Sequence, residues 1–176
     1  MIKPAPNVYV SGMKQVKEIP CPLDSYRTEV QPDWIDDNNH MNVAYYVLAF
    51  DYATDGLFNF LGLTRAYKDA NNVSTFAVEM NVSYRQEMRL GEPMRIQTRL
   101  LDSSDKGLHY FHEMYHATEN YLAATNECLS MHMDMSVRRI APMADEVLQW
   151  VEQVRIAHNS LATPSAAGRV LGIRRK

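Results

Sequence analysis

The 176-residue sequence lacks the features that mark several classes of protein. Its two cysteines, Cys21 and Cys128, are too few for the disulfide framework of a small secreted protein. No apolar run approaches the roughly 18 residues that a membrane-spanning helix needs. The start of the chain, MIKPAPNVYV, has no apolar signal-peptide segment. We therefore expect a soluble, cytoplasmic protein that has no membrane partner.

Excess basic charge is missing as well. The formal net charge is -3, which gives no electrostatic footprint for nucleic acid or for an anionic membrane. Internal repeats and low-complexity tracts are also missing. With 46% hydrophobic and 22% charged residues, the composition is that of a globular protein with a true core. The length fits one domain, and we expect no nucleic-acid partner.

The clearest helix is predicted over residues 42–61. Its apolar side chains recur mostly at steps of three and four residues, which places them on one face; they are Val43, Tyr46, Val47, Phe50, Leu57, Phe58 and Leu61. Asn42 or Asn39 fits the N-cap, and Gly62 fits the position after the last turn. A shorter helix is predicted over residues 65–70, with Thr64 as its N-cap.

After Asn72 the apolar pattern changes to a period of two, which is typical of strands. Together with a short strand over residues 26–31, we expect four long strands at residues 76–84, 94–100, 108–118 and 123–137. Short turns rich in Gly, Asp, Ser and Asn separate the long strands, which favours an antiparallel meander. A last helix is predicted over residues 143–158, with Pro142 opening it.

These elements predict one α+β domain over residues 25–158. A single apolar helix has one sheet to pack against, so the sheet is expected to wrap around that helix. Such a sheet leaves edges that can pair with a second copy of the chain. Residues 1–24 are expected to form an irregular arm, and residues 159–176 a mobile basic tail.

A dense polar cluster, WIDDNNHMNVAYY (residues 34–46), lies directly before the long helix. Asp36, His40, Asn42 and Tyr46 have the spacing D-x-x-x-H-x-N-x-x-x-Y. This combination resembles the signature of hotdog-fold acyl-CoA thioesterases of the 4-hydroxybenzoyl-CoA thioesterase type. In that family the signature joins the first strand to the central helix.

The resemblance extends over residues 25–140 and includes the late segment MHMDMSVRRIAP. Asp51, five residues after Tyr46, stands where the family often carries an acid. The resemblance implies an α+β hotdog fold, in which an antiparallel sheet is wrapped around a long central helix.

The chain is also similar to the thioesterases of carnitine breakdown, which act on betainyl-CoA. This similarity implies a hydrolase for a small acyl-CoA. It implies a homodimer or homotetramer, with the active site formed between two subunits. It implies no metal and no bound cofactor, because a carboxylate, water and amide dipoles suffice for the reaction.

Thioester hydrolysis needs one group that attacks or activates water and another that stabilises the oxyanion. By resemblance, Asp36 is the nucleophile or general base, and the backbone N–H near Val43 polarises the carbonyl at the positive end of the helix. His40 and Asn42 would hold the loop, position water or contact the thioester. Simpler roles also fit: a turn cap for Asp36, a loop hydrogen bond for His40 and a helix cap for Asn42.

Four residues are expected to contact the substrate: Trp34, Asn39, Tyr46 and Asp51. Asn39 stands where many family members have glycine, and asparagine tolerates a left-handed backbone better than most residues. Its side chain is expected to narrow or reshape the pocket. Asp51 also fits a second role, the pairing with a cation across a dimer interface.

Aromatic residues suggest a way to hold the quaternary ammonium group of betainyl-CoA, because aromatic faces attract such cations. The candidates are Trp34, Tyr45, Tyr46, Tyr110 and Tyr115. Their alternative role is in the core or at an interface. The basic residues of segment 169–176 either contact the coenzyme A phosphates or form a solvated end.

The segment HEMYH, from His112 to His116, matches the zinc-protease pattern H-E-x-x-H. That pattern binds zinc only on a helix, where residues four apart meet one metal. This segment is predicted to be a strand, on which the two histidines lie about 13 Å apart at roughly 3.3 Å per residue. We therefore expect no metal site and no metalloprotease.

Two further functions fit a hotdog fold. An enoyl-CoA hydratase carries a motif resembling D-x-N-P-x-H, with the histidine five positions after the aspartate. Here His40 follows Asp36 by four positions, and no proline follows Asn38, which argues against a hydratase. A non-catalytic acyl-CoA binding module stays open, and it would tolerate the loss of Asp36.

Overall fold

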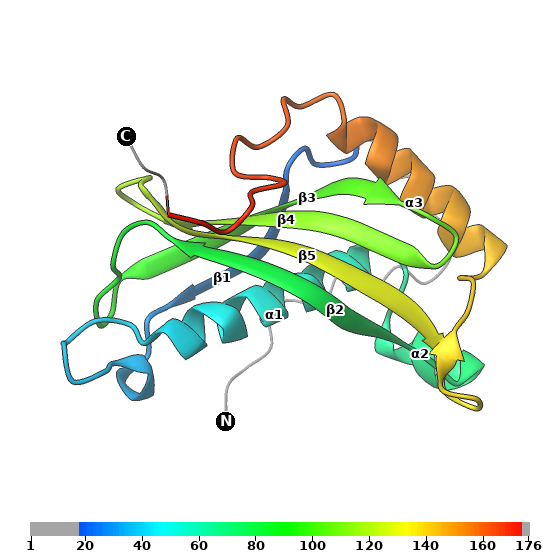
Figure 1. Cartoon of the computed structure of the whole chain (residues 1–176), viewed down its shortest axis with the longest axis horizontal. Coiled ribbons are helices and arrows are strands. Elements are labelled where there is room, and N and C mark those ends of the chain that lie inside the picture. The colour runs from blue at the N-terminus through cyan, green and yellow to red at the C-terminus, as the bar shows by residue number, and fades with distance from the viewer. Residues whose placement is uncertain (1–17, 174–176) are drawn as a thin grey trace.

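Residues 18–173 are described by a computed structural model in which one curved antiparallel sheet holds a long helix (Figure 1). In chain order the elements are β1 (Leu23–Glu29), the short 3-10 helix η1 (Pro32–Trp34), α1 (Val43–Phe60), α2 (Arg65–Asn71), β2 (Val73–Tyr84), β3 (Pro93–Ser103), β4 (Gly107–His116), β5 (Leu122–Asp134), β6 (Arg139–Ile140) and α3 (Asp145–His158). The sheet order is β1-β3-β4-β5-β2, with β6 paired to β5. This arrangement confirms the predicted α+β hotdog fold.

Helix α1 is the centre of the core. Most of its predicted apolar face is buried against the sheet, but Val43 in the first turn is exposed and Val47 is half-buried; the buried residues are Tyr46, Ala49, Phe50, Ala53, Leu57 and Phe58. The side chain of Asn42 accepts a hydrogen bond from the N–H of Ala44 at 2.9 Å, which confirms Asn42 as the N-cap. Gly62 has φ +85°, a backbone conformation that favours glycine after a helix.

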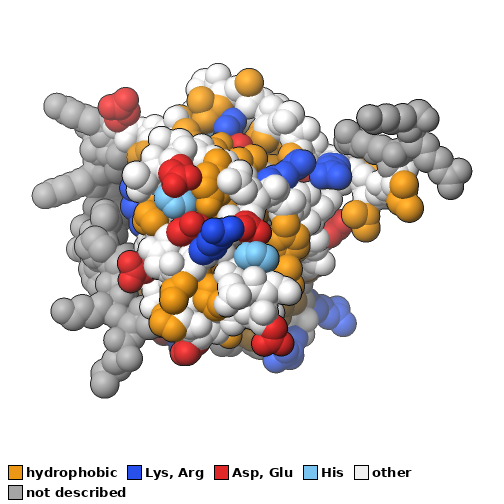
Figure 2. All heavy atoms as spheres, turned by 90° about the vertical axis from the view of Figure 1, so that its left-hand side faces the viewer, with side chains coloured by type: hydrophobic (Ala, Val, Ile, Leu, Met, Phe, Trp, Pro, Cys, Tyr) orange, Lys and Arg blue, Asp and Glu red, His pale blue; other side chains and the backbone are white. Residues whose placement is uncertain are grey.

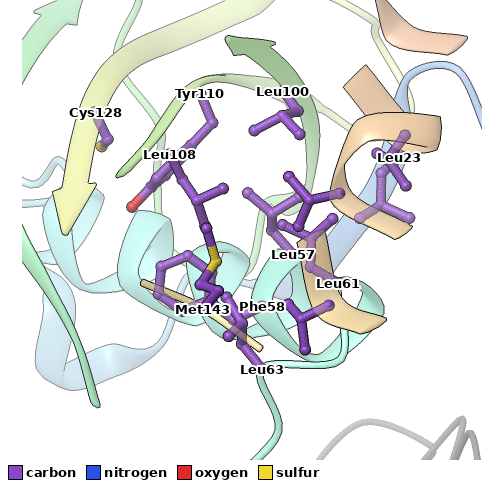
Figure 3. Packing of buried hydrophobic residues seen from close by; sticks show 13 residues of the cluster. Leu23, Leu57, Phe58, Leu61, Leu63, Leu100, Leu108, Tyr110, Cys128 and Met143 are labelled. Atoms are coloured by element: carbon purple, nitrogen blue, oxygen red, sulfur yellow. The ribbon is translucent and has the colours of Figure 1, made fainter. Parts of the chain in front are cut away.

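The far end of α1 packs in a cluster shared with the sheet and α3. Figure 3 shows Leu57 of α1 and Leu61, the residue after the helix, in one cluster with Leu100 of β3, Tyr110 of β4 and Met143. Met143 lies just before α3, and its N–H donates to Asp105 O at 2.9 Å. Because this contact keeps Met143 outside the helix, α3 begins two residues later than the sequence predicts.

The path of the chain through the sheet differs from the predicted meander of four strands. Strands β3, β4 and β5 do form a meander, but β2 pairs with β5 and not with β3. The connection from β2 to β3 packs over the start of α1, where Met88 is fully buried and its N–H donates to Tyr46 Oη at 3.0 Å. Strand β2 is therefore an edge strand of 12 residues.

The chain after α3, predicted as a basic tail, has contacts with the sheet. Its described part crosses the face of the sheet opposite to α1, here called the outer face (Figure 1). Arg99 Nη1 on β3 donates to Ala162 O at 2.8 Å, and Gly168 N–H donates to Glu127 Oε2 on β5 at 2.8 Å. Polar side chains of the outer face thus hold this segment by hydrogen bonds. Residues 174–176 and most of the predicted arm, residues 1–17, lie outside the described part.

Candidate active site

The loop between β1 and α1 is closed by backbone hydrogen bonds. Ile35 and Met41 form an isolated antiparallel bridge, and inside it Asp36 N–H donates to His40 O at 2.9 Å. Asn39 closes the turn with φ +61°, the left-handed conformation that the sequence predicts for this position. The loop thus delivers the chain to the first turn of α1 in a defined geometry.

The carboxylate of Asp36 takes part in this turn. Its Oδ1 atom accepts a hydrogen bond from Asn38 N–H at 2.8 Å and lies 3.5 Å from His40 N. The Oδ2 atom forms no hydrogen bond within residues 18–173. The turn-capping role and a chemical role are therefore compatible, because one oxygen fixes the loop and the other is free to act on a substrate.

The first turn of α1 supplies an N–H group for an oxyanion. Asn42 N–H donates to Trp34 O at 2.8 Å, and the Asn42 side chain caps Ala44 N–H. Within the described chain, Val43 N–H between them donates no hydrogen bond. A free N–H at the positive end of a helix is suited to a developing negative charge.

A hollow of about 300 Å³ opens at this end of the molecule. Its lining comes from the loop, the start of α1 and the end of β2; the lining residues are Asp36, His40, Met41, Val43, Tyr46, Tyr84, Arg85, Gln86 and Glu87. Figure 2 looks onto this end and shows acidic, basic and histidine side chains crowded among apolar ones. The hollow brings together four of the residues singled out in the sequence.

The other four candidates lie outside this lining. Trp34 is buried and stacks on Tyr45 with ring centroids 5.6 Å apart. Asn39 is exposed at the tip of the loop, and Asn42 has its side chain engaged as the helix cap. Asp51 is exposed farther along α1. In a single chain these residues support the loop and the helix, or face away from the hollow.

Glu87 is a member of the site that the sequence pattern did not reveal. Its Oε2 atom lies 3.0 Å from His40 Nε2, and its Oε1 atom accepts from Arg89 Nη2 at 2.8 Å. The hydrogen bond from Arg89 holds the pKa of Glu87 below its usual value, and His40 acts in the same direction. Glu87 therefore adds a second carboxylate, ionised at neutral pH, to the hollow.

Tyr84 is the second such member. Its hydroxyl donates to Val43 O at 3.3 Å, and its ring meets that of Tyr46 edge-on with centroids 5.3 Å apart. Alternation along β2 placed Tyr84 on a strand face, but only the pairing of β2 with β5 puts that face beside the start of α1. Its ring is exposed at the hollow.

Four of the five aromatic candidates do not line this hollow: Trp34, Tyr45, Tyr110 and Tyr115. Tyr110 is buried in the core, and its hydroxyl is 2.8 Å from Ser130 Oγ. Tyr115 lies on β4 with Arg95 over its ring, 4.7 Å from the centroid. Neither lines the hollow, and the burial of Tyr110 agrees with the core role that the sequence analysis gave as its alternative.

The HEMYH segment lies on β4, as predicted. His112 is fully buried, with Nδ1 2.7 Å from Thr98 Oγ1 and Nε2 3.0 Å from Thr54 Oγ1. Burial lowers the pKa of His112 to about 3, so its ring is neutral. His116 Nδ1 accepts from Glu119 N–H at 3.0 Å. Both histidines thus have structural hydrogen bonds on a strand.

Comparison with known proteins connects this geometry to a family. Residues 30–151 match the model of the thioesterase-like superfamily. The chain belongs to this family. A betainyl-CoA thioesterase of Pseudomonas aeruginosa is 36% identical over 151 residues, which cover 86% of this chain and 95% of that protein. The L-carnitine dehydrogenase/betainyl-CoA thioesterase of Rhizobium meliloti is 30% identical, and the match covers 88% of this chain but 31% of that longer protein.

Solved structures agree on the fold. A Staphylococcus aureus protein solved in complex with CoA has a TM-score of 0.81 at 22% identity, covering 89% of this chain and 99% of that one. A DHNA-CoA thioesterase of the same organism has a TM-score of 0.71 at 15% identity, covering 85% and 97%. The family match and the 36% identical relative confirm the prediction of an acyl-CoA thioesterase. Within residues 18–173, no helix is long and apolar enough to cross a membrane.

Proposed function

We propose that this enzyme hydrolyses betainyl-CoA to betaine and CoA in the hollow at the start of α1. The observation that carries the proposal is the shared lining: the carboxylate of Asp36 and the first turn of α1 at Val43 open into one space. The name of the Pseudomonas aeruginosa relative supports the acyl group.

In the proposed reaction, Asp36 attacks the thioester carbon directly or removes a proton from the water that attacks it. The carbonyl oxygen becomes an oxyanion and accepts a hydrogen bond from Val43 N–H, at the positive end of α1. Collapse of the oxyanion breaks the carbon–sulfur bond, and CoA leaves as a thiolate that then takes up a proton. If Asp36 attacks directly, water hydrolyses the acyl-enzyme in a second step. His40 is positioned for this chemistry by Glu87.

The walls of the hollow suit a cationic acyl group. Tyr46 and Tyr84 contribute aromatic rings, and aromatic faces attract quaternary ammonium groups. Asp36 and Glu87 contribute carboxylates, which favour a positive ligand by simple attraction. Arg85 lies on the same lining and is exposed, a suitable position for the phosphates of the CoA moiety.

We also propose that the working form is a homodimer joined through β2. This edge strand has 12 residues, and its exposed apolar side chains, on both faces of the strand, are Phe76, Val78, Met80 and Tyr84. A long apolar edge is a template for pairing with another strand. Antiparallel pairing of β2 with β2 of a second copy would join two sheets and bring two copies of α1 side by side. Asp51, exposed on α1, would then face the second copy, and further pairing of dimers would give a tetramer.

A substrate pair separates hydrolysis from recognition of the cation. Betainyl-CoA and 3,3-dimethylbutanoyl-CoA have the same acyl shape, but only the first carries a positive nitrogen. Thiol release should favour betainyl-CoA by about tenfold in kcat/KM, as expected for a desolvated cation–π contact. The variant Tyr84→Leu should lose most of that preference, while its rate on the neutral substrate changes little.

Three outcomes distinguish the parts of the proposal. Equal rates on the two substrates would contradict recognition of the cation but keep thioester hydrolysis. A preference that survives in Tyr84→Leu would remove Tyr84 from recognition. No thiol release from either substrate, or from a panel of short acyl-CoAs, would contradict the proposed hydrolysis itself.

A further inference from the structure

The C-terminal segment, residues 159–173, follows a fixed course across the outer face of the sheet. It is held first at β3 by Arg99, then at β5 by Glu127, whose other carboxylate oxygen is 2.8 Å from His109 Nε2 on β4. At β2, Asn81 Nδ2 donates to Arg169 O at 2.8 Å. The segment thus crosses the strands in their order in the sheet and arrives at the free edge.

Beyond Arg169 the segment leaves the body of the protein. Val170, Leu171 and Ile173 expose 89%, 90% and 91% of their surface. Figure 2 shows the C-terminal end projecting away from the rest of the molecule with apolar side chains on it. Three exposed aliphatic side chains within four residues, on a segment that is anchored just before them, are unusual for a surface that only contacts water.

Arg169, the last residue of the segment held by β2, lies at one end of that strand. This position limits which surfaces the projecting residues can contact. Arg169 Nη1 also donates to Ser83 Oγ at 3.3 Å. Ser83 is one residue from the C-terminal end of β2, and Ser74 is one residue from its start. If two copies pair antiparallel about the middle of β2, Ser83 lies opposite Ser74 of the second copy, and the two outer faces become continuous.

An apolar patch lies on the outer face near Ser74. Phe76 pairs with Met131 across β2 and β5, Ser74 pairs with Met133, and Glu79 pairs with Leu129. These residues share the outer face with Asn81 and Glu127, because paired residues point to one side and alternate residues of β5 do too. Phe76 is exposed, and Leu129, Met131 and Met133 are half-exposed.

We propose that Val170, Leu171 and Ile173 bind this patch on a second copy of the chain, so that two C-terminal segments clasp the dimer reciprocally. The occupant is a second copy because the anchored segment ends at the edge where that copy is expected and projects past it. A two-fold axis then makes both contacts identical. This inference rests on the β2 dimer of the proposed function and adds a second contact to it.

Cross-linking tests the contact directly. We would combine Leu171→Cys with Met131→Cys in a Cys21→Ser background; the remaining Cys128 is buried. Mild oxidation should give a covalent dimer on a non-reducing gel. The matched pair Leu171→Cys with Gln97→Cys, on the more distant strand β3, should give none. No covalent dimer from the first pair, or equal amounts from both, would overturn the proposed contact.

Dimer dissociation provides a second measurement. The variant Leu171→Asp/Ile173→Asp should raise the dimer dissociation constant about tenfold or more, because buried aliphatic surface is replaced by charge. Thr163→Asp/Ser165→Asp adds the same charge to exposed positions of the same segment and should leave the constant unchanged. Sedimentation equilibrium measures both.

The outcomes separate this proposal from the one it rests on. A dimer that dissociates equally in both double variants would overturn the clasp and keep the β2 dimer. A monomer at all concentrations would overturn the clasp together with the β2 dimer. Thioester hydrolysis is judged separately by thiol release from the wild-type protein.

Discussion

At the residue scale, single side chains in this site have a structural and a chemical task at once. Asp36 uses one carboxylate oxygen to close the turn before α1, and the residue also lines the hollow. Tyr46 lines the hollow, and its hydroxyl also accepts the N–H of Met88. To separate the two roles of such a residue, a variant must remove one functional group and keep the rest of the side chain.

Replacing Tyr46 by Phe removes one hydroxyl and keeps the ring. Met88 is fully buried, so its N–H would lose its hydrogen-bond acceptor and stay without one. We expect a loss of about 1–3 kcal/mol in the free energy of unfolding, measured by urea denaturation. An unchanged free energy of unfolding would show that this bond does not hold the β2–β3 connection in place.

The sequence predicted this motif well and its surroundings poorly. The spacing from Asp36 to Tyr46 and the left-handed Asn39 depend on neighbours within the loop, and local residues determine them. Tyr84 reaches the site from the C-terminal end of β2, and Glu87 reaches it from the turn that follows this strand. Their position at the site depends on which strand pairs with β2, and no local sequence pattern predicts that pairing.

At the element scale, α1 and β1 are so close that only a glycine fits between them. A Cβ atom at Gly56 would lie 2.3 Å from Ser25 O, a backbone atom that cannot move alone. The same contact fixes the position of α1 in the sheet, and with it the first turn that faces the hollow.

We expect Gly56→Ala to destabilise the protein by about 1–3 kcal/mol, the usual cost of overpacking a core. The gain in helix propensity from alanine, about 1 kcal/mol, offsets only part of it. Thermal unfolding measures the change, with Gly172→Ala as the control, since no atom lies within 4 Å of a Cβ there. A stabilised Gly56→Ala variant would contradict the close contact between α1 and β1.

The helices were easier to predict from sequence than the sheet order. Short stretches of sequence determine the main features of the helices. These features are the apolar face of α1, its N-cap at Asn42 and the N-cap of α2 at Thr64. Alternation likewise marked β3, β4 and β5, whose short turns favour neighbouring pairs. The return of β2 to β5 is a contact between distant segments, which no short stretch of sequence specifies.

At the scale of the whole molecule, the buried histidines tie stability to pH. Burial lowers the pKa of His112 to about 3, against 6.5 as its usual value, and burial also lowers the pKa of His158. Both rings are held by hydrogen bonds, His112 to two threonines and His158 to Leu100 N–H and Pro20 O.

The unfolded chain therefore takes up protons before the folded one does. The stability that depends on the neutral rings is complete above about pH 6.5 and is lost progressively as the pH falls toward about 3. We expect the free energy of unfolding in urea to be lower at pH 5 than at pH 7, and the difference to shrink in His112→Gln. An equal difference in both proteins would assign the pH dependence to other groups.

We propose that the carboxylate of Asp36 performs the hydrolysis. The most direct test is kcat/KM for thiol release from betainyl-CoA by wild type, Asp36→Asn and Asp37→Asn, with unfolding curves to confirm the fold. Asp37 is an exposed neighbour with the same side chain. We expect Asp36→Asn to lose about 100-fold or more, as for removal of a general base, while Asp37→Asn stays close to wild type. A folded Asp36→Asn variant with wild-type turnover would contradict the claim.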